Sequence, residues 1–380
     1  MNNKWTYKKI GEIGTILRGK GIQKTDFIEN GQPCIHYGQI HTVFDVSTNK
    51  HLSTISSDLY NKSIIASTGD VLLTLTSEDV EGSCKSTAWL GNYDVAVSSD
   101  AAILKHSLNP KFFVYYTRSN SFYAEKAKYA RGFKVTHIKT SDIAEIPVPV
   151  PSIEKQDSIV SELDKINELI RIKKAQLEDF NCLEQSVFYD MFGTPSSNDK
   201  CWDIKKISDV ANYFNGTAHE QDIDNDGKYI LVNAKFIASK GVIYKRTSVQ
   251  RFPLYKNDIA MVLSDVPNGK ALAKCYLINK DNTYSLNQRI CCFRGFGGSP
   301  VFLKFVLNRH PYFLSFDDGN GQTNLRKKDV EDFPLIVPPV SLQQSFEQKI
   351  AFLENEKEQI ASTVNDLETL FASRMQYWFD

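Results

Sequence analysis

The feature that most constrains the fold of this 380-residue chain is an internal repeat. When position 132 is placed on position 319, segment 132–158 aligns with segment 319–345, and eight of the 27 positions are identical. Segments 5–19 and 69–74 align with 202–216 and 257–262 at similar offsets. Chance similarity is a poor alternative, because the blocks keep the same order in both halves. The chain is predicted to hold two copies of one scaffold, with matching ends and a divergent middle.

A long helical pattern follows each copy, after Pro151 and after Pro338. Apolar residues recur there at the three- and four-residue spacing of a coiled coil. The predicted seam consists of Ile159, Leu163, Ile166, Ile170, Leu177 and Phe180 in the first helix and Phe346, Ile350, Leu353, Ile360, Val364 and Leu367 in the second. Lys173, Glu184 and Lys357 interrupt it. Because so long a helix needs a partner for its apolar side, we expect the two helices to pack antiparallel; the alternative is that each packs on its own domain.

The expected fold class is α+β, with two repeated mixed α/β domains joined by two long antiparallel coiled-coil helices. The predicted domains cover residues 1–150 and 193–337, and the predicted helices cover 151–192 and 338–380. Short apolar runs bounded by Gly, Asn and Asp predict strands at 71–75, 94–105, 228–237, 258–263 and 289–293. Segments 109–119 and 299–309 predict helices that begin at a proline.

Charge and composition narrow the class of protein. The 45 basic and 45 acidic side chains cancel, but the two predicted domains carry +3 and +5 and the two helical segments −4 each. Seven cysteines without a C-x-x-C pair argue against disulfides and zinc. No apolar run approaches the ~20 residues that span a bilayer, and the first residues lack a signal-peptide core. We therefore expect a cytoplasmic protein with no membrane partner.

Two stretches come close to nucleotide-binding motifs without matching them. Residues 14–21 approach the phosphate-binding loop but end in Gly21, where a hydroxyl is required. Residues 293–297 resemble the glycine loop of methyltransferases, yet the chain has no N/D-P-P-Y/F motif. We interpret both as turns. The seven histidines form no H-x-x-x-H or H-E-x-x-H pattern, so no metal site is predicted.

The matched ends of the two copies carry a resemblance to a known family. Each copy opens with W-x-x-K-K-I, at 5–10 and 202–207, and closes with a G-x-x-x-T motif followed by Asp142 or Asp329. A proline-rich junction containing Gln156 or Gln343 then leads into the long helix. This order, occurring twice, resembles the specificity subunit of type I restriction–modification systems, and the resemblance covers essentially the whole chain.

The resemblance implies a non-catalytic DNA-recognition subunit. Each domain would read one half of a split double-stranded DNA target, and the helices would dock two methylation subunits. Restriction subunits, which act as translocase and nuclease, would complete the complex. No cofactor is expected on this chain, and S-adenosylmethionine is expected on the methylation subunits. Two alternatives remain open: a self-contained DNA-modifying enzyme, and a coiled-coil scaffold that binds protein.

Candidate DNA-binding residues are those with forked, amide or cationic side chains in the divergent loops. In the first domain they are Arg18, Lys20, Lys24, Tyr37, Gln39, His41, Ser83, Lys85, Ser86, Arg131, Lys134 and His137. In the second domain they are Asn233, Lys235, Lys240, Lys245, Arg246, Asn268, Lys270, Gln322, Asn324 and Arg326. The pairs Thr136/Thr323 and Asp142/Asp329, which match between the copies, are interpreted instead as helix-capping scaffold.

Overall fold

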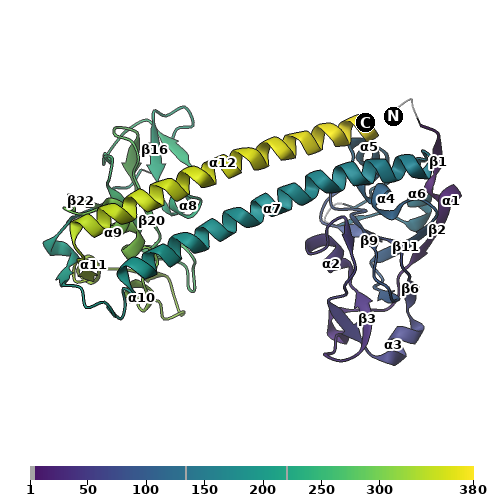
Figure 1. Ribbon diagram of the computed structural model, residues 1–380, viewed down its shortest axis with the longest axis horizontal. Helices are drawn as coiled ribbons and strands as arrows, with labels where there is room; N and C mark the ends of the chain where they lie inside the picture. The colour runs from purple at the N-terminus through teal and green to yellow at the C-terminus, as the bar shows by residue number, and fades with distance from the viewer. Residues whose placement is uncertain (1–4, 133–134, 220) are drawn as a thin grey trace. The chain divides into compact units, whose positions relative to one another are not determined.

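The computed structural model describes residues 5–132, 135–219 and 221–380. It divides into two compact units, Met1–Lys174 with Ala361–Asp380 and Ala175–Ile360. Each unit holds one copy of the repeat and one half of each long helix. The mixed α/β domains and the two antiparallel helices confirm the predicted fold class (Figure 1).

The first unit is built on two sheets. The larger has the strand order β2-β11-β7-β9-β4, and the smaller has the order β5-β3-β10-β6, with a parallel β3–β10 pair. Two ribbons, β1–β13 and β8–β12, complete the domain. Its strands are β1 (Tyr7–Lys9), β2 (Gly14–Arg18), β3 (Gln32–Ile35), β4 (Ser47–Thr48), β5 (Ser53–Ile55), β6 (Ile64–Ala66), β7 (Val71–Thr74), β8 (Thr76–Ser77), β9 (Ser86–Trp89), β10 (Val95–Val97), β11 (Ala101–His106), β12 (Thr136–His137) and β13 (Pro147–Pro149). Its short helices are α1 (Ile10–Ile13), η1 (Lys24–Asp26), α2 (Tyr37–Thr42), α3 (Ser57–Lys62), α4 (Pro110–Tyr116), α5 (Asn120–Ala127) and α6 (Thr140–Ala144).

The second unit repeats this plan with fewer strands. Its sheets have the orders β15-β22-β18-β20 and β17-β16-β21, with ribbons β14–β24 and β19–β23. The strands are β14 (Ile204–Lys206), β15 (Asn212–Asn215), β16 (Tyr229–Val232), β17 (Lys245–Thr247), β18 (Ile259–Val262), β19 (Ser264–Asp265), β20 (Cys275–Leu277), β21 (Tyr284–Leu286), β22 (Ile290–Arg294), β23 (Thr323–Asn324) and β24 (Pro334–Ile336). The helices are η2 (Ile207–Asp209), α8 (Ala234–Ala238), α9 (Pro300–Leu307), α10 (Pro311–Leu314) and α11 (Lys327–Glu331).

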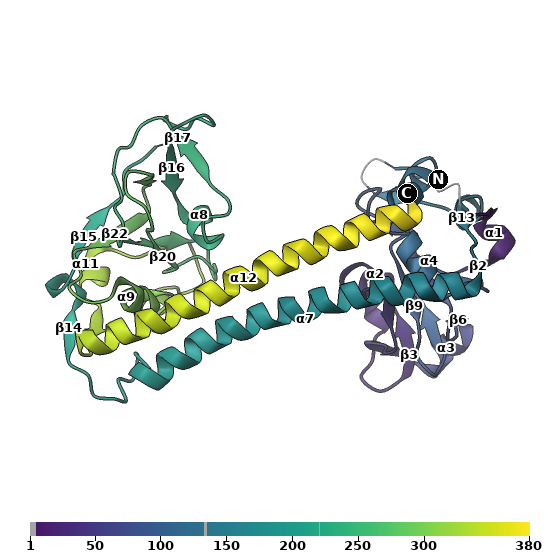
Figure 2. The same cartoon turned by 45° about the horizontal axis from the view of Figure 1, so that its top comes forward.

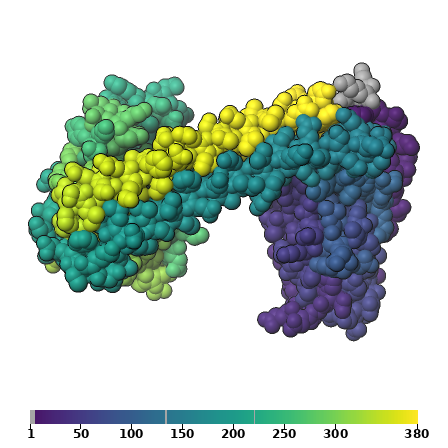
Figure 3. All heavy atoms as spheres, in the orientation of Figure 1, coloured from purple at the N-terminus to yellow at the C-terminus, as the bar shows by residue number. Residues whose placement is uncertain are grey.

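The long helices are α7 (Ile153–Phe192) and α12 (Val340–Phe379), each of 40 residues. Within each unit their two segments run side by side in opposite directions, as two views show (Figures 1 and 2). All twelve predicted seam residues are buried or half-buried. The space-filling view shows the segments of the first unit, α7 in teal and α12 in yellow, packed against each other (Figure 3).

A repeated glutamine attaches each helix to its domain. The Gln156 side chain accepts a hydrogen bond from the Asn109 amide and donates one to the Pro151 carbonyl, at 2.8 and 2.9 Å. Gln343 repeats this pattern with the Ser299 amide and the Pro338 carbonyl, at 3.0 and 2.8 Å. Both glutamines are buried. The same residue type therefore occurs in both copies because it fixes the start of a long helix against α4 or α9.

Each domain also packs against the C-terminal end of one long helix: the first domain against α12 and the second against α7. Phe379 of α12 lies 5.4 Å from Phe112 in the first domain, and Phe192 of α7 lies 4.7 Å from Phe302 in the second, measured between ring centroids. Phe192 and Phe379 occupy equivalent positions in the alignment that places 132 on 319. The C-terminal ends of α7 and α12 therefore fill equivalent positions in the hydrophobic cores of the two domains. Each core thus packs against residues from both long helices.

Three sequence predictions are wrong in detail. The run 94–105 predicts one strand, but it forms two, β10 and β11, which belong to different sheets. The apolar run 228–237 predicts one strand, but β16 ends at Val232 and α8 begins at Ala234 because the Asn233 side chain accepts a hydrogen bond from the Phe236 amide. Thr136 and Thr323 cap no helix; they lie buried in β12 and β23. They are still part of the shared scaffold. In the described part of the chain, no helix is long and apolar enough to cross a membrane.

Candidate nucleic-acid interface

A groove of about 1300 Å³ opens on the first domain. Five predicted DNA-binding residues line it: Lys24, Tyr37, His41, Lys85 and Ser86. They come from η1, from α2 and from the start of β9 with the residue before it. The fold therefore brings side chains from well-separated parts of the sequence to one concave surface.

Helix α2 presents Tyr37 and His41 to this groove. Its N-terminus is capped by His36, whose Nδ1 accepts a hydrogen bond from the Gly38 amide at 3.1 Å. Burial lowers the pKa of His36, which keeps the imidazole neutral and its Nδ1 available as an acceptor. At the other end of the helix, Nε2 of His41 lies 2.8 Å from the Thr76 carbonyl of β8. The Lys85 ammonium donates to the His41 carbonyl at 2.6 Å, which ties the loop before β9 to α2.

Three of the predicted residues use their side chains inside the protein. Gln39 accepts from the His36 amide and donates to Ser53, so it is part of the α2 cap. The Ser83 hydroxyl donates to the Val80 carbonyl at 2.7 Å. Ser86 lies 2.6 Å from the Thr117 hydroxyl and is almost fully buried. Ser86 lines the groove, whereas Gln39 and Ser83 lie outside its lining, and all three side chains are poorly placed to contact a ligand.

The remaining predicted residues of the first domain lie outside the lining of the groove. Arg131 and His137 are exposed and joined by two backbone hydrogen bonds, and His137 pairs with Thr76 across the β8–β12 ribbon. Arg18 donates to the Ser99 carbonyl at 3.0 Å, and Lys20 is exposed. Lys134 lies outside the described residues.

Sequence reasoning missed several groove residues in the helical layer. Arg118, Asn120 and Lys126 line the groove, although they belong to a region predicted only as helical scaffold. Arg118 forms an ion pair with Asp45 at 2.7 Å. No local sequence pattern marks these residues, because only the packing of α4 and α5 under the sheet places them at the groove.

In the second domain the predicted residues form two groups. Around the β19–β23 ribbon, Gln322 donates to the Ser264 hydroxyl at 3.4 Å, and Asn324 donates to the Gln322 carbonyl at 3.3 Å. Asn268 is exposed in the left-handed conformation (φ 53°) and its amide donates to Asp317. Exposed Lys270 and Arg326 flank this group in the sequence.

The other group lies on β16, β17 and α8. Asn233 is the cap of α8, so its side-chain oxygen is already used. Lys235, Lys240 and Lys245 are exposed. Arg246 donates to the Gly227 carbonyl at 3.3 Å and lies over the Tyr244 ring at 5.4 Å. This group offers cations, whereas the ribbon group offers amides.

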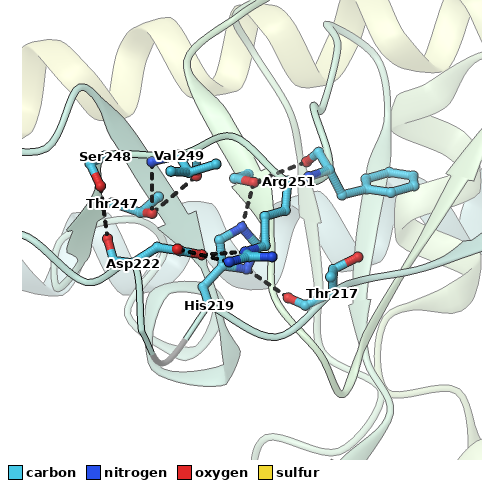
Figure 4. Close-up of polar contacts among 9 residues, drawn as sticks. Thr217, His219, Asp222, Thr247, Ser248, Val249 and Arg251 are labelled. Carbon is cyan, nitrogen blue, oxygen red and sulfur yellow. Dashed lines mark hydrogen bonds and ion pairs between the residues drawn. The ribbon is translucent and has the colours of Figure 1, made fainter.

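A polar network, buried at His219 and exposed at Arg251, supports the loop before β16 (Figure 4). The His219 ring contacts the Thr217 carbonyl through Nδ1 at 2.6 Å and the Ser285 hydroxyl through Nε2 at 2.8 Å. Arg251 forms a bidentate ion pair with Asp222. A serine beside a histidine is the start of a nucleophile–base pair, but Ser285 is fully buried and also bonds to the backbone of Phe252, so no substrate reaches it. The network orders the loop.

The two near-matches to nucleotide-binding motifs have structural explanations. Gly14 lies in β2, where a Cβ would stand 2.2 Å from the Lys105 carbonyl, so this stretch is a paired strand and not a phosphate loop. Gly295 follows the end of β22 with φ 76°, which fits the predicted turn. Among the described residues, no group of His, Cys, Asp or Glu side chains is arranged to hold a metal ion.

With two copies of one domain, each presenting a different polar surface, the architecture defines a two-domain recognition protein. Residues 2–179 and 199–367 match the family described as type I restriction modification DNA specificity domain. Because these matches cover most of the chain, the protein belongs to that family.

One relative and two solved structures are similar to this chain. The type I restriction enzyme MjaVIII specificity subunit of Methanocaldococcus jannaschii is 24% identical over 189 residues, which are 48% of this chain and 44% of the relative. The match thus spans less than half of that curated relative. The S subunit of a type I restriction–modification system from M. genitalium shares the fold with a TM-score of 0.56 at 14% identity, over 99% of this chain and 96% of the other. A chain from a structure of the type I R-M system, described in terms of complex assembly and conformational transition, gives a TM-score of 0.63 at 14% identity over 100% and 98%.

Proposed function

We propose that this protein is the non-catalytic DNA specificity subunit of a type I restriction–modification complex. Its family membership and the names of its relatives support this class of function. The observation that carries the proposal is the contrast between scaffold and surface. The two domains share ribbons, helical layers and helix docking, but the groove of the first offers Tyr37, His41 and Lys85, whereas the ribbon of the second offers Asn268 and Gln322.

Two surfaces of different chemistry on one scaffold suit a target with two different halves. Amide side chains pair with adenine edges, and cationic side chains pair with guanine edges and phosphates. Each domain then reads one half-site, and the spacer between the halves is not read. The mildly basic domains, +3 and +5, supply few phosphate contacts, so partner subunits provide much of the sequence-independent affinity.

In this proposal the long helices dock two methylation subunits, and restriction subunits join that core. S-adenosylmethionine binds the methylation subunits and not this chain. The acidic character of both helical segments, −4 each, suits a surface that contacts protein and not DNA phosphates. The proposed site of action is the cytoplasm, where the DNA target is found.

The class of function is tested by methyl transfer. The purified chain is incubated with DNA and labelled S-adenosylmethionine, with and without the methylation subunits. We expect label on DNA only when the methylation subunits are present. Methyl transfer by the chain alone would favour the self-contained enzyme, and a full complex without sequence preference would favour the protein-binding scaffold.

The groove is tested by a matched pair of lysine substitutions in the full complex. Lys24 is exposed and lines the groove, whereas Lys62 is exposed on α3 and does not. Lys24→Ala should weaken DNA binding for all sequences and reduce the slope of log affinity against log salt by about one. Lys62→Ala should leave the slope unchanged. Equal effects of the two substitutions would place DNA elsewhere on the domain.

A further inference from the structure

The two domains share one loop that leaves and re-enters the large sheet at equivalent points. In the first domain it follows β7 and returns at Cys84, whose amide donates to the Thr74 carbonyl at 3.0 Å. In the second it follows β18 and returns at Ala273, whose amide donates to the Val262 carbonyl at 3.0 Å. Cys84 and Ala273 both have positive φ angles, 56° and 55°. The path of the backbone at this point is therefore the same in both copies, although the loop sequences differ.

In each domain, a cationic side chain in or next to the short helices donates hydrogen bonds to backbone carbonyls of this loop. The Lys126 ammonium, in α5, donates to the carbonyls of Glu81 and Ser83 at 2.8 and 2.6 Å. The Arg309 guanidinium, just after α9, donates to the carbonyls of Gly269 and Leu272, both at 3.2 Å. Ser83 and Leu272 each immediately precede the residue with positive φ. The same backbone carbonyl thus receives a cation in both domains.

The two cations do not align in the repeat. In the alignment that places 132 on 319, Lys126 falls on Phe313 and not on Arg309. Different residues from different parts of the helical layer therefore make the same contact. What the two copies have in common is the anchored loop, and the identity of the anchor varies.

The first anchor is tightly bound to its loop. Lys126 is only 4% exposed, and burial lowers the pKa of its ammonium group. The loop supplies two carbonyl acceptors for this ammonium, and the nearby carboxylates of Glu81 and Asp79, in the same loop, also favour its charge. Moving the loop would leave a buried ammonium without hydrogen bonds, which is costly. The contact therefore restricts the loop to one conformation.

We propose that Lys126 and Arg309 are positioning residues for DNA reading, each fixing the loop of its own domain. This inference rests on the proposed function. The second loop carries exposed Asn268 and Lys270. The residues that the first loop supplies to the groove are Ser77, Glu78, Asp79, Glu81, Gly82 and Lys85. A base contact depends on the placement of its side chain to within about 0.5 Å. Releasing the anchor should loosen sequence discrimination at one half-site while leaving the other half-site as it was.

The test is made with the full complex on a DNA library in which both half-sites are varied. In Lys126→Met, preference for the first domain's half-site over singly substituted sequences should fall about 5- to 100-fold, the range for loss of a good base contact. Preference at the other half-site should not change. Arg309→Met should give the reverse pattern. Lys126→Arg and Arg309→Lys, which keep a cation, should retain most of the discrimination.

Exposed lysines supply the controls: Lys128→Met, just after the helix that carries Lys126, and Lys256→Met in the second domain. Thermal unfolding of each variant separates loss of fold from loss of positioning, and the two domains give independent variants if one does not fold. Equal loss at both half-sites, or lower overall methylation with unchanged relative preferences, would overturn the inference. A wild-type complex that shows no preference for a two-part DNA sequence would instead refute the proposed function.

Discussion

A chain cut after Phe192 should form a dimer, because it keeps the first domain and α7 but loses α12. In the full chain, Phe379 packs on Phe112, and Trp378 and Arg374 bond to Glu162. Truncation exposes these surfaces. A second copy of α7 can cover them, since Phe192 occupies the position equivalent to Phe379 in the repeat and already packs this way on the second domain.

One buried position makes that dimer imperfect. Glu184 and Lys357, with side chains only 11% and 15% exposed, form an ion pair at 2.8 Å between α7 and α12. Burial acts against the charge of Lys357, but the bond to Glu184 and the nearby carboxylates leave its pKa raised. In the repeat alignment, the positions equivalent to this pair are Phe371 and Ile170. In a dimer of two α7 helices, Glu184 of the second copy therefore lies opposite Ile170, with no lysine beside it.

The size of this penalty follows from the contacts that are lost. Phe371 packs on Tyr115 with ring centroids 6.1 Å apart, and a half-buried Phe contributes about 1–2 kcal/mol. A buried carboxylate without a partner costs roughly a further 1–3 kcal/mol. Glu184→Leu should recover about 1–2 kcal/mol at each of two symmetric sites, which lowers the dimer Kd by about 30- to 1000-fold.

Analytical ultracentrifugation of the truncated chain measures this Kd. Glu178→Leu, on an exposed position of the same helix, is the matched control and should leave the Kd within a few-fold. In the full-length chain the same Glu184→Leu change should lower the free energy of unfolding, because buried Lys357 loses its partner at 2.8 Å and keeps only Glu354, at 3.3 Å. A truncated chain that stays monomeric at all concentrations would refute the antiparallel pairing, and an unchanged Kd in Glu184→Leu would refute the role of the buried pair.

Three further predictions follow from the domains. Exchange of residues 193–337 for the same block of another family member should change only one half of the methylated motif, and changes in both halves would contradict independent reading. Arg294→Met should lower the free energy of unfolding in urea by about 3–5 kcal/mol, because Asp258 stays buried without this ion pair. Lys105→Met, in the equivalent pair with Asp70, should cost about 1 kcal/mol or less, because the Lys105 side chain is 41% exposed, although that of Asp70 is only 11% exposed. Burial lowers the pKa of His106 to about 4, so the unfolded chain binds a proton first, and the free energy of unfolding should fall by about 3 kcal/mol as pH drops from about 6.5 to 4. His106→Gln should flatten this dependence, and an unchanged slope would count against the assignment to His106.

The scaffold was largely predictable from the sequence because its signals are local and occur twice. Gln156 and Gln343, matched by the repeat, mark the start of each long helix, and the seam periodicity predicts the pairing. The polar interruptions at Glu184 and Lys357 are visible in the sequence, but their pairing depends on the antiparallel register. The start of α8 was not predicted, because it lies within an apolar run that has strand propensity. A single helix cap, Asn233, outweighs that propensity.

The groove was less predictable because tertiary packing creates it. Lys126 reaches the loop 78–83 from a helix distant in the sequence, and its polar partners are backbone carbonyls, which carry no sequence signal. Ser83 and Ser86 match the composition expected of DNA-contacting residues, yet their hydroxyls are used inside the protein. Residue type alone does not separate a side chain that faces a ligand from one that supports a wall.

Sequencing of methylated bases in cells with and without this gene tests the central claim most directly. The account predicts a split motif with two dissimilar halves and an unread spacer, present with the gene and lost without it. A methylation pattern that is unchanged when the gene is removed, or a single contiguous motif, would contradict reading of DNA by two different domains.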